Sequence, residues 1–339
     1  MSDDAAETTI RVAVIGYGHL GRHHARLWST IPGVRLVAVA DTRPEAVAEA
    51  REALGVDGTT DYRELLSAVD AVSVFVPTQA HREVAGRLLE HGVDVLVEKP
   101  IASDAVEGRE LVDIARRCGR VLQVGHIERF NPAFRALSEE RFEARYVECQ
   151  RLAPFTFRGT DVGVVLDLMI HDLDLVLALV GSEVIDVQAF GGAVFTPSED
   201  MASAILKFAN GAVAHLTASR VALKPSRRMR VFSRDAYASI DFSEQNGVVI
   251  RKNAGWDFGK LDLTQVDPSR IDDLWKFVFE GLLRVDRYQI GDGNPLRDEL
   301  IAFVAAVRDR SEPVVSGEAG CAAVESAPRS VDAIRRLPW

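Results

Sequence analysis

The stretch Ile10-Arg-Val-Ala-Val-Ile-Gly-Tyr-Gly-His-Leu-Gly21 decides the fold of the first part of the chain. An apolar strand runs directly into Gly16-x-Gly18-x-x-Gly21, and helical patterning follows from His23 to Trp28. Gly16 permits a tight turn, Gly18 lets a pyrophosphate approach the backbone, and Gly21 lets the helix pack on the strand. The first turn of such a helix offers free N–H groups to phosphates. The stretch therefore predicts a dinucleotide site.

A second predicted strand sets the preference for one dinucleotide. Residues 35–40 form this strand, which leads into Asp41, 20 residues beyond Gly21. A carboxylate there accepts hydrogen bonds from the adenine ribose hydroxyls and repels a 2′-phosphate, so the sequence favours NAD over NADP. Arg43, two residues on, leaves NADP as the less favoured alternative.

Strands and helices then alternate as in a doubly wound parallel sheet. The carboxyl ends of the predicted strands carry Gly16, Asp41, Thr78, Lys99 and His126, and ligands of such sheets bind at that edge. We expect an α/β Rossmann domain over residues 1–127. The expected helices span 43–54, 80–90 and 103–117, and the expected strands 70–76, 94–97 and 120–124.

The patterning changes beyond residue 128. Short strand-like segments follow one another, and Asn210-Gly211 between two of them is a hairpin signal. They span 146–152, 184–194, 202–208, 212–219, 228–233 and 237–242, with helices expected over 164–180, 271–285, 295–310 and 318–337. Residues 128–339 therefore predict an α+β domain with a large, open, mostly antiparallel sheet, whose C-terminal helix can pack back on the first domain.

Composition excludes several classes of protein. The 339 residues carry a formal net charge of −10, which argues against holding nucleic acid or an anionic membrane through bulk charge. Cys118, Cys149 and Cys321 lie far apart without metal-site or disulfide-framework spacing, which indicates a reducing compartment. The first nine residues resemble no export signal, and no apolar run approaches a membrane span. We expect a cytoplasmic protein without nucleic-acid or membrane partners.

Lys99 is the first candidate for chemistry. It follows a predicted strand between Glu98 and Pro100, and the proline restricts the backbone and can supply a cis bond. A lysine at the cofactor cleft can hydrogen-bond a substrate hydroxyl or take part in proton transfer. The alternative is a surface lysine that follows a strand.

Asp167 and His171 are the second candidate, because residues four apart share a helix face. A carboxylate beside an imidazole sets its tautomer and stabilises the imidazolium, which suits a histidine that takes a proton from an alcohol. His171 could instead be a core histidine, and Asp172 and Asp174 could form a solvated face or bind substrate. The spacing matches no common metal site, so no metal is predicted.

Arg129, Asn131 and Arg158 are candidates for holding a polar or phosphorylated substrate, because they follow the change of domain. Each arginine could equally be a surface ion-pair residue.

The motifs Gly16-Tyr-Gly-His-Leu-Gly21, Pro77-Thr-Gln-Ala-His81, Glu98-Lys-Pro100 and Asp167-x-x-x-His171 occur in this order. Together they resemble the glucose–fructose oxidoreductase/inositol dehydrogenase (GFO/IDH/MocA) family over nearly the whole length. The resemblance implies a Rossmann domain followed by an open-sheet domain, NAD(P)-dependent oxidation or reduction of a ring hydroxyl, and homo-oligomers, dimers or tetramers, that associate through the sheet.

The resemblance also implies roles for individual residues. Lys99 and His171 match the family's catalytic lysine and histidine, and Asp167 matches the acidic residue one turn before that histidine. The predicted cofactor-binding residues are Gly16, Tyr17, Gly18, His19, Leu20, Gly21, Asp41, Thr78, His81, Glu98, Lys99 and His126. The predicted substrate-binding residues are Lys99, Arg129, Asn131, Arg158, Asp167 and His171.

One further segment points to a substrate. Gly125-His-Ile-Glu-Arg-Phe-Asn-Pro132 is similar to members that act on nucleotide sugars, notably UDP-N-acetylglucosamine 3-dehydrogenases. That similarity implies oxidation of a 3-hydroxyl to a 3-keto sugar, which a partner aminotransferase converts to a 3-amino sugar for lipopolysaccharide. The alternatives are a dehydrogenase of free monosaccharides or inositol, and a non-catalytic NAD-binding regulatory protein.

Overall fold

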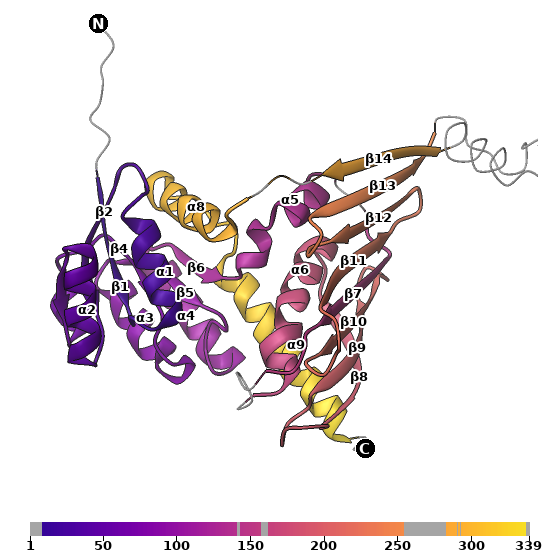
Figure 1. The fold of residues 1–339 in the computed structure, drawn as a ribbon, viewed down its shortest axis with the longest axis horizontal. Coiled ribbons are helices and arrows are strands. Elements are labelled where there is room, and N and C mark those ends of the chain that lie inside the picture. Colours follow the sequence, from indigo (N-terminus) through magenta and orange to yellow (C-terminus); the bar gives the residue numbers. More distant parts are fainter. Residues whose placement is uncertain are drawn as a thin grey trace, which may run out of the picture. The chain divides into compact units, whose positions relative to one another are not determined.

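Six parallel strands form the sheet at the start of the chain (Figure 1). The computed structural model describes residues 9–140, 143–156, 162–253, 283–289, 291 and 293–336. The sheet order is β3-β2-β1-β4-β5-β6, so the order reverses direction at β1. Its strands are β1 (Ile10–Ile15), β2 (Val34–Ala40), β3 (Asp57–Thr59), β4 (Ala71–Val74), β5 (Asp94–Glu98) and β6 (Leu122–Gly125).

Helices cover both faces of this sheet, which explains why its central strands are nearly continuous apolar runs. Every residue of β4 is buried, and its one polar side chain, Ser73, accepts a hydrogen bond from the indole of Trp28 at 3.0 Å. The helices are α1 (His19–Trp28), α2 (Pro44–Leu54), α3 (His81–Glu90), α4 (Ala105–Cys118) and α8 (Pro295–Asp309), with short 3₁₀ turns at Tyr62–Leu65, Thr78–Ala80 and Ile127–Phe130.

Part of the C-terminal region belongs to this first unit. The described chain forms two compact units, and Asn294–Glu325 group with the residues up to Phe130. The ring of Phe303 on α8 meets that of Trp28 edge-on, with 6.4 Å between centroids, and the N–H of Val124 donates to the carbonyl of Val315. The sequence placed 128–339 in a second domain whose C-terminal helix can pack back on the first. In the structure, α8 and the start of α9 (Gly317–Arg336) group with the first sheet.

The second unit, Asn131–Gly293 with Ser326 onward, contains an eight-stranded sheet (Figure 1). Its order is β14-β13-β12-β11-β7-β10-β9-β8, and only β7 and β10 pair in parallel among the described strands. The strands are β7 (Tyr146–Leu152), β8 (Val184–Gly192), β9 (Met201–Phe208), β10 (Val213–Ser219), β11 (Ser226–Phe232), β12 (Ala236–Asp241), β13 (Asn246–Lys252) and β14 (Leu283–Gln289).

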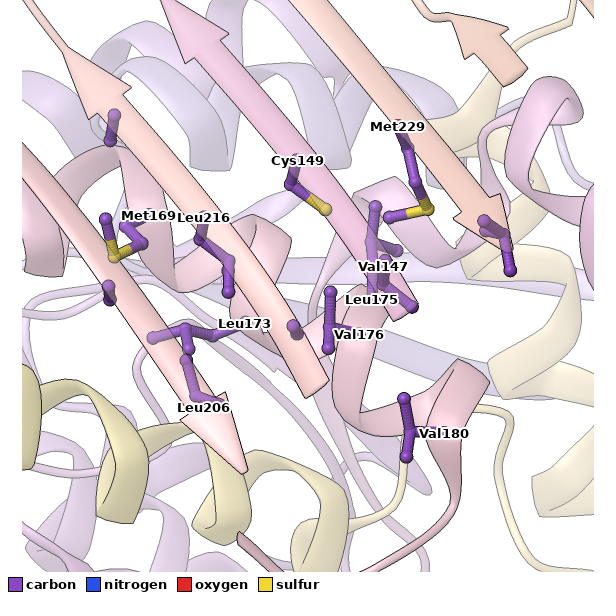
Figure 2. Packing of buried hydrophobic residues seen from close by; sticks show 14 of the residues in the cluster. Val147, Cys149, Met169, Leu173, Leu175, Val176, Val180, Leu206, Leu216 and Met229 are labelled. Atoms are coloured by element: carbon purple, nitrogen blue, oxygen red, sulfur yellow. The ribbon is translucent and has the colours of Figure 1, made fainter. Parts of the chain in front are cut away.

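One face of this sheet is packed against helices α5 (Pro132–Glu139) and α6 (Ile170–Val180). Side chains of α6 such as Leu173 and Val176 meet Val147, Leu206 and Leu216 from three strands (Figure 2). Alternate residues of β7 are buried, so the opposite face carries the other half of its side chains. Helix α6 is terminated by Gly181, whose φ of +60° suits a residue without a Cβ.

Most predicted elements are present, with four differences. Strands β3, β13 and β14 and helix α5 have no counterpart in the sequence prediction. The predicted helix 271–285 is wrong where it can be checked: Leu283–Val285 open strand β14, and residues 271–282 lie outside the described part. The segment Leu-Arg-Val-Asp-Arg-Tyr-Gln pairs with β13 along its length, and Tyr288 packs against the core of the second unit. Among the described helices, none has the length and apolarity needed to cross a bilayer.

Candidate cofactor and substrate site

Two glycines bring α1 onto β1 at the start of the cofactor site. A Cβ on Gly21 would lie 1.9 Å from the carbonyl oxygen of Gly16, so only glycine lets the helix approach this closely. Gly16 has φ +92°, and a Cβ there would lie 2.4 Å from the carbonyl oxygen of Phe75. Gly18 precedes the first turn of α1 and has nothing within 4 Å of where its Cβ would be. The first turn of α1 is thus left open to a phosphate.

Asp41, at the end of β2, is fixed as an oriented carboxylate. It accepts the N–H of Tyr17 at 2.7 Å, and Arg43 donates to both of its oxygens at 3.0 Å. Partial burial acts in the opposite direction, but the hydrogen bonds from Arg43 and Tyr17 lower the pKa of Asp41. Asp41 is therefore ionised at neutral pH and retains acceptor capacity for ribose hydroxyls.

A cavity of about 420 Å³ adjoins these groups, and its lining includes Gly16, Gly18, Asp41, Tyr62 and Phe75. It combines the open glycine turn, an anionic group and aromatic surface at the switch point of the sheet order, which is where dinucleotides bind in such folds. The residues present fit NAD: the start of α1 would hold the pyrophosphate and Asp41 the adenosine ribose. Sequence reasoning missed Tyr62, since the short β3 and the turn after it gave no periodic signal.

The other predicted cofactor residues differ from one another in exposure and in their contacts. Leu20 is 45% exposed and His19, which stacks edge-on with His23, is also exposed. Thr78 is half-buried in the turn before α3. His81 is buried, and its ring nitrogens lie 2.9 Å from the carbonyl oxygen of Pro100 and 3.0 Å from that of Val76.

His81 thereby connects the start of α3 to the segment that carries Lys99, where the Lys99-Pro100 bond is cis. Burial lowers the pKa of His81, although the carbonyl contacts oppose this. The predicted cofactor residue His126 is also buried, directly after β6.

Lys99 is half-buried, as is its neighbour Glu98. Burial raises the pKa of its neighbour Glu98 to about 7, although Lys99 opposes the shift through its charge and its N–H. Gly125 makes room for this carboxyl group, because a Cβ there would lie 2.7 Å from Glu98 Oε2. Burial and the charge of Glu98 raise the pKa of Glu299, which is 1% exposed on α8. No sequence motif pointed to Glu299, which lies 201 residues from Glu98 in the chain.

In the second unit, Asp167 and His171 lie on consecutive helical segments. Asp167 belongs to a π-helical segment, Val165–Met169, and His171 to the first turn of α6. Glu199 holds the start of the π-helical segment: its carbonyl accepts the N–H of Val164 at 3.0 Å, and its carboxylate lies against the N–H of Val165. Single π turns are uncommon and concentrate at functional sites. The sequence predicted one continuous helix here.

The neighbouring aspartates Asp172 and Asp174 are both buried. Asp172 is 5% exposed and forms two hydrogen bonds with Arg151 of β7, at 2.8 and 3.0 Å. Asp174 is fully buried. The hypothesis that these two residues form a solvated face is therefore wrong, and the Arg151–Asp172 pair instead fixes α6 to the sheet.

A second buried ion pair lies at the carboxyl end of β10. Arg220, 5% exposed, donates to the carbonyl of Val162 at 2.6 Å and lies 3.8 Å from Asp167 and 3.9 Å from Asp200. Asp200 accepts the N–H groups of Val194, Phe195 and Thr196. Burial opposes ionisation, but these hydrogen bonds lower the pKa of Asp200 to about 2. Sequence reasoning missed Arg220, although its position directly after a predicted strand was a usable signal.

The three remaining substrate candidates differ in setting. Asn131 caps α5, because its side chain accepts the N–H of Ala133 at 3.0 Å. Arg129 is half-buried in the turn before it, and Arg158 lies outside the described residues. Within the described part, no group of three or more His, Cys, Asp and Glu side chains could hold a metal ion.

Comparison with protein-family models gives two matches. Residues 10–126 match an oxidoreductase family with an NAD-binding Rossmann fold, and residues 136–239 match the GFO/IDH/MocA C-terminal domain. The chain belongs to the GFO/IDH/MocA family. As in other GFO/IDH/MocA members, the first unit is an NAD-binding Rossmann domain and the chain is an oxidoreductase.

Individual members of the GFO/IDH/MocA family show more specific similarity. The chain is 44% identical to UDP-N-acetylglucosamine 3-dehydrogenase of Acidithiobacillus ferrooxidans over 73% of this chain and 78% of that protein. It is 30% identical to scyllo-inositol 2-dehydrogenase (NAD(+)) of Bacillus subtilis over 63% and 68%. A solved structure of UDP-N-acetylglucosamine 3-dehydrogenase GnnA from A. ferrooxidans superposes with a TM-score of 0.84 at 35% identity, covering 97% of this chain and 98% of that one.

Replacing Asp41 should reverse the discrimination between the two dinucleotides. Asp41→Ala removes the ribose acceptor and the charge that opposes a 2′-phosphate, and frees Arg43 to meet one. We expect the Kd for NAD to rise about tenfold or more while that for NADP falls, measured by calorimetry. Asp70→Ala is the control, since Asp70 pairs with Arg11 near the amino ends of β1 and β4, away from the carboxyl end of β2 where Asp41 lies. Equal effects on both dinucleotides would contradict the assignment.

The raised pKa of Glu98 predicts that Glu98→Gln stabilises the folded protein in a pH-dependent way. An acid whose pKa rises from 4.5 to about 7 on folding destabilises the protein as the pH increases through that window. Glutamine removes the buried charge, so we expect a gain of up to about 3 kcal/mol at pH 8, seen as several degrees in Tm, and little change at pH 4.5. Glu52→Gln, on the exposed side of α2, should change Tm at neither pH. An identical shift at both pH values would argue against the assignment.

Proposed function

We propose that the protein uses NAD to oxidise the 3-hydroxyl of UDP-N-acetylglucosamine to a 3-keto sugar. The observation that carries this proposal is the 44% identity to a UDP-N-acetylglucosamine 3-dehydrogenase. The segment Gly125–Pro132, similar to nucleotide-sugar members of the family, supports the same substrate.

The residues have complementary roles in this proposal. His171 takes the proton of the 3-hydroxyl as hydride leaves C3, so that the carbon–oxygen bond becomes a carbonyl. Asp167 stabilises the imidazolium that forms, and Lys99 donates a hydrogen bond to the reacting oxygen. Bound NAD supplies the nicotinamide that accepts the hydride. Arg129 and Arg158 are proposed to bind the diphosphate, because guanidinium groups form paired hydrogen bonds with phosphate oxygens.

The direct test is turnover by the purified protein. With NAD and UDP-N-acetylglucosamine we expect NADH absorbance to rise and mass spectrometry to show a product two mass units lighter, if necessary with an aminotransferase removing the ketone. N-Acetylglucosamine without UDP should give no activity. His171→Ala and Lys99→Ala should each lower kcat by about a hundredfold or more while NAD binding is retained. Absence of turnover in every arrangement would overturn the substrate assignment.

A second candidate is oxidation of a free inositol or monosaccharide, favoured by the 30% identity to scyllo-inositol 2-dehydrogenase. Turnover of inositols but not of the UDP sugar would select it. A non-catalytic NAD-binding regulatory role is a third possibility, selected if Lys99→Ala and His171→Ala leave the biological role intact.

The proposed product is a ketone suited to transamination. We therefore propose an aminotransferase as the next enzyme, giving a 3-amino sugar for lipopolysaccharide, and a cytoplasmic location, in keeping with three cysteines that form no disulfide.

We also propose that the face of the eight-stranded sheet opposite helices α5 and α6 joins copies of the chain into a homo-oligomer, a dimer or a tetramer. Tyr146, Phe232 and Tyr237 form an aromatic group on this face, with ring centroids 5.7 and 5.0 Å apart. Tyr146 and Phe232 are 37% and 38% exposed. Arg230 and Glu148 form a cross-strand ion pair beside them. Aromatic groups within a polar surround are typical of protein interfaces.

Phe232→Glu should therefore convert the oligomer to a smaller species. A carboxylate placed among the aromatic rings loses hydration on association, so light scattering after size exclusion should give a lower mass. Leu223→Glu is the matched control, because Leu223 is 99% exposed and lies outside the strands. The interface assignment fails if Phe232→Glu keeps the wild-type mass.

A further inference from the structure

Arg220 contacts the acid–base region of the second unit without being available to substrate. Its side chain is 6% exposed, and its backbone N–H donates to the carbonyl of Asp200 at 2.9 Å. The guanidinium lies 3.8 Å from Asp167 and 3.9 Å from Asp200. One buried cation is thus shared by a half-exposed carboxylate and a fully buried one.

Asp200, the buried carboxylate near Arg220, is held in one orientation. Asp200 is completely buried, accepts the N–H groups of Val194, Phe195 and Thr196, and also accepts the Thr196 hydroxyl at 2.8 Å. Four donors fix the orientation of its carboxylate, so Asp200 provides a fixed anion against which the guanidinium is placed.

Arg220 also reaches the chain just before the π-helical segment. It donates to the carbonyl of Val162 at 2.6 Å, one residue before Gly163. A Cβ on Gly163 would lie 1.8 Å from Glu199 Oε1, so this residue must be glycine for Glu199 to meet the helix start. Arg220 and Glu199 therefore secure the same short segment from two sides.

We propose that Arg220 is a positioning residue for the Asp167–His171 pair, holding Asp167 as an oriented carboxylate and setting its electrostatic effect on the imidazole. This inference rests on the proposed role of that pair in proton transfer. Arg220 itself contacts neither substrate nor cofactor in this role.

Loss of the Arg220 cation should stabilise the charged form of His171 for two reasons. Asp167 would carry an uncompensated negative charge, and His171 would lose a nearby positive one, so the imidazolium becomes more stable. The other charged groups around this helix start include Glu199, Asp200, buried Asp174 and the Arg151–Asp172 pair, all of which the substitution leaves in place.

The test compares Arg220→Met, which keeps an unbranched stem but removes the charge, with Arg220→Lys, which keeps the charge. We expect the NMR titration midpoint of the His171 ring to rise by about half to one pH unit in Arg220→Met and to stay near wild type in Arg220→Lys. This measurement is independent of turnover, so it decides the proposal even if the substrate assignment fails. An unchanged midpoint in a folded Arg220→Met protein would overturn it.

Kinetics provide the second measurement. In an active wild-type enzyme, Arg220→Met should lower kcat about 10- to 100-fold with the KM for NAD within about twofold, and move the acid limb of the pH–rate profile upward. Arg251→Met is the control, since it removes a second acid-paired arginine of the same unit, the partly buried partner of Glu140. If both variants lower kcat equally with wild-type pH profiles, Arg220 is structural and the proposal is wrong.

Discussion

The approach of Gly21 to the carbonyl of Gly16 is the constraint on which the cofactor site depends. With 1.9 Å between that oxygen and the position a Cβ would take, only glycine permits α1 to lie against β1 here. This contact directs the first turn of α1 toward the cavity that Asp41 lines from β2. Backbone placement thus directs free N–H groups toward a phosphate in a chain with a net charge of −10.

The proposed acid–base pair of the second unit has a different requirement, because such chemistry needs side chains held to within a fraction of an ångström. Buried ion pairs provide this at two points. Arg151 and Asp172, both less than 10% exposed, join β7 to α6 just beyond His171, and Arg220 joins Asp200 to the region around Asp167. Buried pairs add little net stability compared with apolar contacts, but they specify one geometry. Their value here lies in that specificity.

Sequence patterns predicted the features that depend on interactions over a few neighbouring residues. The glycine turn, the apolar runs of β1 and β4 and the Asn210-Gly211 hairpin follow from rules that act over a few residues, and all three are present. Strand β14 was missed because its charged residues obscure the alternation. The setting of Glu299 depends on Glu98, which is distant in sequence, so no local pattern could assign it. The position of Arg220 directly after a strand was a local signal, but its partners Asp167 and Asp200 could be named only from the structure. Asp167 and His171 were recognisable through family motifs, whereas the π turn between them was not.

The π-helical segment connects these observations. Such a turn is less favourable than regular α-helix, so it persists where neighbours hold it. At its start, Glu199 occupies the space that Gly163 leaves by lacking a side chain; at its end, Asp172 is fixed to β7 by Arg151. Asp167 lies between these two anchors and remains partly exposed, whereas Val165 and Met169 in the same segment are fully buried. A regular helix secured at the same two points would need a different number of residues between them. The π-helical segment is therefore the local adjustment that lets Val165 and Met169 reach the core while Asp167 stays beside Arg220.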